Sequence, residues 1–345
     1  MKWNTVRALT RAGRGPVLWS LSRLGRGFYR IGYLGGGLRW GLLRRIAERP
    51  ATVDELADDL GEGMPVADGM RSALASWLDL GVALGELRVA DGRYQVCSRL
   101  ALALLRPDRD DLAAIVEEYA TVYGDMLSSV PRRLATGERY TMADLDARLI
   151  TRSSRISAPF IEEAINAVVP AAGPMRLLEV GCGSGAFIAS AHRRNPDLTA
   201  IGLELQAEAA EAARENLAAW GLAGFAGAPV VVELGDVRER ASEPAFDLVT
   251  LHQNVYYFPE SERVALFAHL REFLVPGGLL LVTSATRPGG PEVSGLDLWC
   301  ATADGFDRLP DAEQTCEQLR MAGFGQVRSD RLGPAGALTA FVARR

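Results

Sequence analysis

A glycine-rich segment near the middle of the chain, LLEVGCGSGA at residues 177–186, constrains the fold more than any other part of the sequence. The apolar run at 175–180 predicts a buried parallel strand. Three glycines at alternate positions follow, and a helical pattern then extends to about residue 194. Glycine lets the backbone approach a ligand, and a helix amino terminus presents N–H groups to it. The segment therefore predicts a nucleotide-binding turn in an α/β fold.

The turn alone is compatible with two nucleotides. As Gly181-x-Gly183-x-x-Ala186 it satisfies the dinucleotide fingerprint, and Glu204 lies where an acidic residue would meet a ribose. As Glu-x-Gly-x-Gly-x-Gly, starting at Glu179, it is similar to motif I of the class I S-adenosylmethionine (SAM)-dependent methyltransferases. The sequence after the turn has to decide between them.

Strand and helix patterns alternate over residues 171–345. Strands are predicted at 175–180, 198–203, 229–234, 246–251 and 279–284, and helices at 186–194, 208–220, 261–274 and 311–321. Such alternation predicts a parallel, doubly wound sheet. Two closing strands, at about 326–332 and 338–343, are too close together for a helical crossover, so one of them must run antiparallel.

This ending favours SAM over a nicotinamide cofactor. Five strand–helix units and a final hairpin resemble the class I methyltransferase layout, a Rossmann-like seven-stranded sheet. The segments 246–249, 274–278 and 322–324 match that family in order and spacing. A nicotinamide enzyme would need a separate catalytic domain, and the mainly helical amino-terminal half does not look like one.

Residues 38–105 predict a small winged helix. The first helix is expected at 38–48. The second begins at a capping box formed by Thr52 and Glu55, and the third extends over 69–80 and ends before Gly81. A hairpin is expected to turn at Asp91-Gly92. The third helix, 67–80, has Arg71 as its only cation, so we expect no nucleic-acid binding. The run at 50–57 resembles the dimerisation domain of small-molecule O-methyltransferases, which implies a homodimer.

The amino terminus has a charge opposite to that of the rest of the chain. Residues 1–50 hold eleven Lys or Arg and one acid, whereas 51–345 hold 27 basic and 42 acidic residues. Apolar residues between 17 and 38 follow a helical period with arginines between them. This amphipathic helix could attach to a membrane surface, helped by Trp3, Trp19 and Tyr29. We favour packing on the body or on a second subunit, because its glycines disfavour a lone interfacial helix.

The predicted organisation has four parts. They are a basic arm at 1–37, the winged-helix dimerisation domain at 38–107, a helical connector and substrate cap at 108–170, and the SAM-binding domain at 171–345. In the resembled family the connector lines the substrate pocket, for which the candidates here are Tyr119, Tyr123, Met126, Tyr140, Met142 and Phe160. The apolar insert at 286–310, which contains Trp299, is expected to cover the pocket.

The resemblance also implies roles for the cofactor residues. The turn of Gly181, Gly183 and Gly185 would meet the amino-acid end of SAM, and Glu179 would order the turn or reach the amino group through water. Glu204 would accept hydrogen bonds from both ribose hydroxyls, and Asp236 would accept one from the adenine amine. The remaining cofactor candidates are Cys182, Leu205, Gly235, Val237 and His252.

The sequence contains one histidine at a position suited to catalysis. His252 ends the fourth strand of the sheet and is the best candidate for a general base. In the resembled O-methyltransferases the basic histidine comes one turn later, where this chain has Tyr256, a poor base at neutral pH. Either His252 replaces that histidine, or the acceptor ionises by itself, or the acceptor is not a phenol. Asn254, Tyr256 and Tyr257 would then orient the substrate.

The predicted function is transfer of a methyl group from SAM to a hydrophobic or aromatic small molecule, at oxygen, leaving S-adenosylhomocysteine (SAH). Two alternatives are a SAM-binding relative with altered or lost methyl transfer, and a SAM-responsive DNA-binding regulator. No cysteine pattern suggests a metal, and the four cysteines are expected to be buried, reduced thiols of a cytoplasmic protein. No apolar run is long enough to span a membrane.

Overall fold

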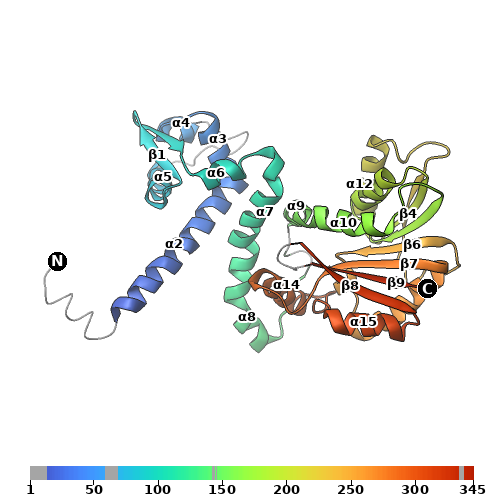
Figure 1. Ribbon diagram of the computed structural model, residues 1–345. Coiled ribbons are helices and arrows are strands. Elements are labelled where there is room, and N and C mark those ends of the chain that lie inside the picture. The colour runs from blue at the N-terminus through green and yellow to red at the C-terminus, as the bar shows by residue number, and fades with distance from the viewer. Residues whose placement is uncertain (1–13, 59–68, 142–143, 145, 334–337) are drawn as a thin grey trace. The chain divides into compact units, whose positions relative to one another are not determined.

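The computed structural model describes residues 14–58, 69–141, 144, 146–333 and 338–345. The chain forms two compact units (Figure 1). Unit 1 comprises Met1–Ala135 with Leu145–Ile156, and unit 2 comprises Thr136–Asp144 with Ser157–Arg345. The predicted connector at 108–170 is thus divided between the two units, with its first helices in unit 1 and its last in unit 2.

Unit 2 is built on one seven-stranded sheet in the order β5-β4-β3-β6-β7-β9-β8. The strands are β3 (Met175–Val180), β4 (Leu198–Glu204), β5 (Val230–Leu234), β6 (Phe246–His252), β7 (Leu274–Ala285), β8 (Gln326–Leu332) and β9 (Leu338–Arg344). The first five pair in parallel, and β9 runs antiparallel to both β7 and β8. The predicted sheet with a closing antiparallel hairpin is confirmed.

Helices cover both faces of this sheet, as its parallel strands require. In Figure 1, α10 (Ala158–Val168) and α12 (Ala207–Ala219) lie above the sheet and α15 (Ala312–Met321) lies below it. The other helices are α11 (Ala186–Arg194), α13 (Arg263–Phe273) and α14 (Pro291–Thr302). The hydrophobic core between the sheet and helices α13 and α15 includes Leu178, Leu251, Phe267, Leu319 and Phe341.

Unit 1 is mainly helical. Its helices are α2 (Arg14–Arg39), α3 (Leu42–Glu48), α4 (Val53–Asp58), α5 (Arg71–Leu84), α6 (Arg99–Leu104), α7 (Asp110–Glu118), α8 (Gly124–Thr136) and α9 (Ala147–Ser154). The predicted hairpin is present as β1 (Leu87–Ala90) and β2 (Arg93–Val96), with Asp91 and Gly92 at positive φ. The predicted capping box is also present, since Thr52 and Glu55 exchange hydrogen bonds of 3.0 and 3.2 Å between backbone N–H and side-chain oxygen.

Several predicted helix ends were wrong. Gly81 does not end the third helix; it lies inside α5, where a Cβ would fall 2.1 Å from the Tyr33 hydroxyl, and Gly85 at φ 82° ends the helix instead. A break at Gly41, with φ 71°, separates α2 from α3, so the helix expected at 38–48 is shorter. Helix α14 occupies part of the apolar insert at 286–310, where no helix was predicted.

The cysteines differ in part from the expectation. Cys182, Cys300 and Cys316 are buried, but Cys97 is exposed, and all four are free thiols. Within the described ranges, none of the helices has both the length and the apolar character that crossing a bilayer requires.

Candidate active site

The glycine turn follows β3 at the carboxyl edge of the sheet. Gly181, Gly183 and Gly185 have φ values of 68°, 52° and 76°, a region that residues with a Cβ rarely adopt. The amides of Gly181 and Cys182 donate to Leu203 O, and the amide of Gly183 donates to the Glu204 carboxylate at 2.9 Å. Several turn N–H groups therefore already have partners, and of the three glycines only Gly183 has open space where a Cβ would lie.

Two of the predicted cofactor carboxylates stand at the ends of neighbouring strands. Glu204 ends β4, and its other oxygen accepts from the amide of Gln206 at 3.1 Å. Asp236 follows β5 and accepts from the backbone N–H and guanidinium of Arg238. This ion pair holds the pKa of Asp236 below its usual range. The sheet thus brings both carboxylates to the edge where the glycine turn lies.

The neighbouring cofactor candidates divide into exposed and buried groups. Leu205 is exposed beside Glu204, and Gly235 donates its amide to Glu204 O. Val237 and Cys182 are buried instead, Val237 in the hydrophobic core of unit 2 and Cys182 near Gly202. Burial raises the pKa of the Cys182 thiol, so the side chain is inert.

Glu179 is buried on β3, two residues before the turn. Neither of its carboxylate oxygens has a partner among the described residues, and both are shielded from solvent. Burial, helped by the negative charge of Glu204, raises the pKa of Glu179 to about 8. An unpartnered buried carboxyl group is costly in the free protein, which is typical of a site that awaits a ligand.

His252, the predicted general base, is buried in the free protein. The imidazole is 6% exposed, its Nδ1 lies 2.8 Å from the Thr283 hydroxyl, and the Phe187 ring packs edge-on against it. Burial lowers the pKa of His252 to about 3, so the ring is neutral and binds a proton only weakly. The sequence could place this histidine at a strand end but could not show how completely α11 covers it.

Asn254 lies at the glycine turn. Its Nδ2 donates to Val180 O at 2.6 Å, and a Cβ built on Gly181 would fall 2.5 Å from the same nitrogen. Its Oδ1 is shielded from solvent and has no partner in the described part of the chain. The residue predicted to orient the substrate is therefore placed against the predicted cofactor turn.

Four aromatic rings form a cluster, here called the aromatic wall, from two segments of unit 2. Tyr256 and Tyr257 belong to the 3₁₀ turn η5 (Val255–Tyr257), Trp299 belongs to α14, and Phe306 follows α14. Phe306 lies between the others, with ring centroids 4.5 Å from Tyr257 and 4.6 Å from Trp299. Tyr256 stacks on Tyr257 at 5.3 Å. Although Tyr257 is 44% exposed, desolvation by the surrounding protein raises its pKa to about 12, with smaller effects of Cys300 and Glu204.

A buried arginine ties the two segments of the aromatic wall together. Arg263, 1% exposed, donates through Nε to Phe258 O at 3.1 Å and through a terminal nitrogen to Arg308 O at 2.8 Å. Asp307 adds a backbone hydrogen bond to Tyr256 O at 2.8 Å, and its carboxylate accepts from the amide of Glu260 at 2.7 Å. Neither Arg263 nor Phe306 was a predicted site residue; the apolar insert was the one signal that pointed to Phe306.

Two predicted substrate residues, Tyr123 and Met126, belong to unit 1. Tyr123 packs edge-on against Tyr119 at 5.8 Å, and Met126 is fully buried. Met142 lies outside the described residues. Tyr140 and Phe160 belong to unit 2, where the Tyr140 amide donates to Thr302 O at the end of α14. Contact of the unit 1 residues with a substrate stays a prediction.

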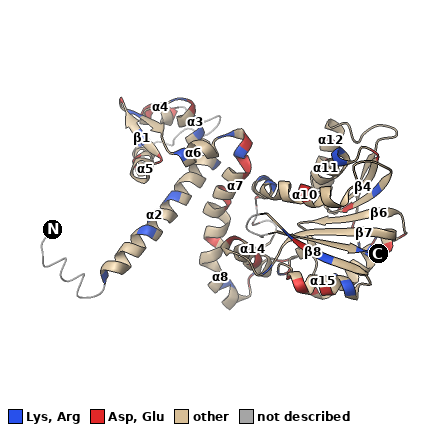
Figure 2. Ribbon diagram, in the orientation of Figure 1, with Lys and Arg blue, Asp and Glu red and all other residues tan. Residues whose placement is uncertain are grey.

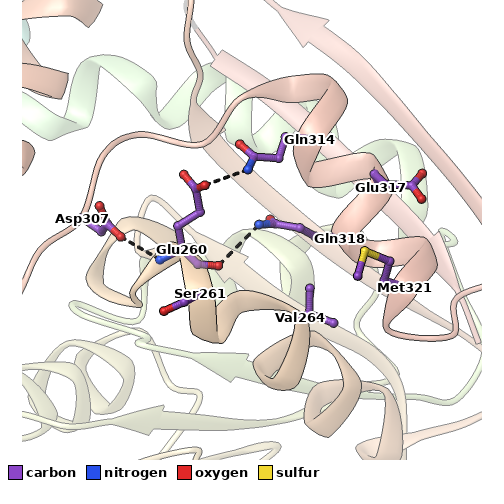
Figure 3. Close-up of a pocket in the computed structure, with 8 residues that line it drawn as sticks. All are labelled: Glu260, Ser261, Val264, Asp307, Gln314, Glu317, Gln318 and Met321. Atoms are coloured by element: carbon purple, nitrogen blue, oxygen red, sulfur yellow. Dashed lines mark hydrogen bonds between the residues drawn. The ribbon is translucent and has the colours of Figure 1, made fainter.

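A cavity of about 660 Å³ lies in unit 2 and shares Glu260 and Asp307 with the segments that carry the aromatic wall (Figure 3). None of the residues that line it was a predicted site residue; they are Glu260, Ser261, Val264, Asp307, Gln314, Glu317, Gln318 and Met321. Glu260 accepts from Gln314 at 2.7 Å and Glu317 pairs with Arg320 at 3.2 Å, so these carboxylates are engaged within the protein. We assign no ligand to this cavity. Among the residues that the structure describes, no group of His, Cys, Asp or Glu is arranged to hold a metal ion.

Comparison with known proteins supports the resemblance found in the sequence. Residues 177–278 match the family model of a methyltransferase domain. The chain is 28% identical over 305 residues to the demethylspheroidene O-methyltransferase of Cereibacter sphaeroides, covering 83% of this chain and 76% of that protein. It is 24% identical over 331 residues to the 3-hydroxy-5-methyl-1-naphthoate 3-O-methyltransferase of Streptomyces sahachiroi, covering 92% of each.

A solved structure shares the fold over nearly the whole chain. The mitomycin 7-O-methyltransferase MmcR superimposes with a TM-score of 0.77 at 19% identity, covering 97% of this chain and 100% of that chain. This likeness establishes the common fold, including the mainly helical amino-terminal region.

Proposed function

The chain is a class I SAM-dependent methyltransferase, and on this premise we propose that it methylates an oxygen of a hydrophobic or aromatic small molecule. The observation that carries the proposal is the aromatic wall, which is built from the segment after β6 and from the insert around α14. Aromatic faces bind flat apolar molecules by stacking and by excluding water. The relatives named as O-methyltransferases of demethylspheroidene and of 3-hydroxy-5-methyl-1-naphthoate support transfer to an oxygen, and the naphthoate supports an aromatic acceptor.

The carboxyl edge of the sheet fits SAM. Glu204 and Asp236 offer carboxylate oxygens to hydroxyl and amine donors, and Gly183 leaves room for close approach. The unpartnered acceptors of Glu179 and Asn254 fit a cationic end. SAM supplies a methyl group on a positively charged sulfur, which is already a good leaving group. The protein then has to hold the acceptor oxygen in line with that methyl group and keep water away.

Neither His252 nor Tyr256 is suited to remove the proton of the acceptor. His252 is buried and weakly basic, and a tyrosine stands at the position that a histidine takes in the resembled family. We therefore propose an acceptor whose hydroxyl ionises near neutral pH, such as a phenol carrying electron-withdrawing groups. Tyr256 would orient this oxygen rather than remove its proton.

Product analysis tests this proposal. The protein is incubated with SAM carrying a deuterated methyl group and a panel of phenols that differ in acidity, and products are separated by mass spectrometry. We expect a labelled methyl ether from hydrophobic, acidic phenols, and slower turnover as the phenol becomes less acidic. Transfer to none of these phenols, or transfer confined to nitrogen or carbon, would contradict the proposal.

We also propose that the protein is a homodimer formed through α2. Val17, Leu21, Leu24, Phe28 and Ile31 alternate at spacings of four and three, which is the pattern of a helix-packing seam. All five are exposed, with Leu24 at 71% and Phe28 at 73%. The same stripe continues to Gly35, where a Cβ would meet Ala120 of unit 1. A seam that begins in the core of unit 1 and continues on exposed helix fits a second copy of this chain.

The alternative partners receive less support. Figure 2 shows basic but no acidic residues along α2, yet Arg26, Arg30 and Arg39 each bind a group of unit 1, which leaves less charge for a membrane surface. Trp3 lies outside the described residues. Within α5, Arg71 pairs with Asp54 and Asp58, so this helix offers phosphates no free cation. A cytoplasmic location stays a prediction.

A further inference from the structure

Asn254 is held in one orientation by its surroundings. The preceding residue, Gln253, has φ 54°, donates its amide to Thr283 O at 2.8 Å and accepts from the amide of Ala285 at 3.0 Å. These bonds to β7 fix the chain direction immediately before Asn254. The side chain then reaches across to β3, where Nδ2 donates to Val180 O. Only the NH₂ end of an amide can donate to a carbonyl, so the positions of Nδ2 and Oδ1 are defined by chemistry.

The consequence is that the other end of the Asn254 amide, the oxygen, has nothing to accept from. Asn254 Oδ1 is shielded from solvent and has no partner in the described structure. A buried acceptor in this state costs free energy unless a ligand satisfies it. Glu179 lies on β3, two residues before Gly181, and its carboxyl group has two further oxygens without a partner. Glu179 and Asn254 together therefore have three buried oxygen atoms without a partner among the described residues.

Buried oxygen atoms without hydrogen-bond donors favour a ligand group that has several N–H bonds and carries a positive charge. The α-ammonium of the methionyl end of SAM has this chemistry. The carboxylate at the same end of SAM does not, because Glu179 would repel it once ionised. The ribose hydroxyls are already provided for by Glu204, one strand away.

We propose that Asn254 is a cofactor-binding residue, whose Oδ1 accepts from the α-ammonium of SAM while its Nδ2 holds the glycine turn. The sequence had suggested instead that it orients the acceptor. This inference rests on the identity of the cofactor in the proposed function and is independent of the acceptor. It also explains why position 181 requires glycine beyond its φ value, because a side chain there would displace the Asn254 amide.

Calorimetric titration with two ligands tests the inference without turnover. One ligand is SAH, and the other is SAH in which hydrogen replaces the α-amino group. We expect the wild-type protein to prefer SAH by about tenfold or more, as for hydrogen bonds to a charged group. In N254A this preference should largely disappear. In N254D, which keeps an acceptor oxygen but loses the donor to Val180 O, the preference should remain.

A matched control is Asn216, whose Nδ2 donates to Ser184 O of the same turn at 3.2 Å. N216A should keep the full preference for SAH. The inference is overturned if N254A keeps it as well, or if N254A and N254D weaken both ligands equally, since that is the result of a purely structural role. Melting temperatures of the unliganded variants verify that each one is folded. A protein that binds SAH as expected but methylates no phenol leaves this inference intact and overturns only the proposed acceptor.

Discussion

At the scale of single residues, Glu179 couples protonation to stability in the free protein. Burial and the charge of Glu204 raise its pKa from 4.5 to about 8. Between these values the folded protein keeps a proton that the unfolded chain has released. Stability therefore falls as pH rises from about 4.5 to about 8, by at most about 1.4 kcal/mol per pH unit from this group, and stays level outside that range.

The variant E179Q should remove this pH dependence. Gln has nearly the same shape as Glu and cannot ionise, so E179Q should gain stability relative to the wild type as pH rises from 5 to 8. The measurement is the urea midpoint of unit 2 at several pH values, with E163Q, at an exposed glutamate, as the control. Saturating SAH should make the urea midpoint of the wild type depend less steeply on pH, because an ammonium partner favours the ionised carboxylate of Glu179. Parallel curves for E179Q and the wild type would show that Glu179 does not titrate in this range.

Residue identity alone predicted some of the site and not the rest. Gly181, Gly183 and Glu204 could be placed because the turn and the strand ends follow from local patterns. The environment of His252 could not, because burial by Phe187 depends on how α11 packs across the sheet. The position of Asn254 likewise depends on a contact between two strands that are 74 residues apart in sequence.

At the scale of elements, Arg263 connects the two segments that form the aromatic wall. It is buried and lies between two carbonyl oxygens, those of Phe258 and Arg308. Burial also lowers the pKa of the guanidinium from its usual value. Lys at this position carries the same charge but lacks the planar fork that reaches both carbonyls.

We therefore expect R263K to impair the acceptor site more than the cofactor site. One lost hydrogen bond in a buried place should raise the KM of the acceptor about tenfold, while the Kd of SAH changes by less than about twofold. Steady-state kinetics and calorimetry provide the two numbers. R320K, at an exposed ion pair on α15, is the matched control. Equal losses in KM and Kd would mean that Arg263 supports the whole fold of unit 2 rather than the wall.

The same scale shows where element prediction fails. The hairpin at Asp91-Gly92 and the capping box at Thr52 were found because their signals lie within a few residues. Gly81 suggested a helix end, yet tertiary packing overrides its propensity, since the close approach of Tyr33 leaves no room for a side chain. Helix α14 escaped notice because Gly and Pro precede it, and Pro291 in fact occupies its first turn, where proline is tolerated.

At the scale of the whole molecule, the two units have separate hydrophobic cores and α2 leaves an apolar seam exposed. Large exposed stripes of this kind are typical of interaction surfaces rather than of isolated proteins. The seam has no acidic residue within α2, so self-association must depend on apolar burial more than on ion pairs. A dimer held in this way should tolerate salt.

The double variant L24E/F28E tests this dimer. It places two carboxylates in the seam and should weaken self-association by at least about a hundredfold, since each large apolar side chain contributes about 1.5–3 kcal/mol on burial. Sedimentation equilibrium over a range of protein concentrations measures the change. V231E, which adds a carboxylate at an exposed position of β5, should remain dimeric. SAH binding should persist in L24E/F28E, because all the cofactor residues lie in unit 2. An unchanged dimer in L24E/F28E would assign the interface to another surface, and a monomeric wild type would exclude the dimer.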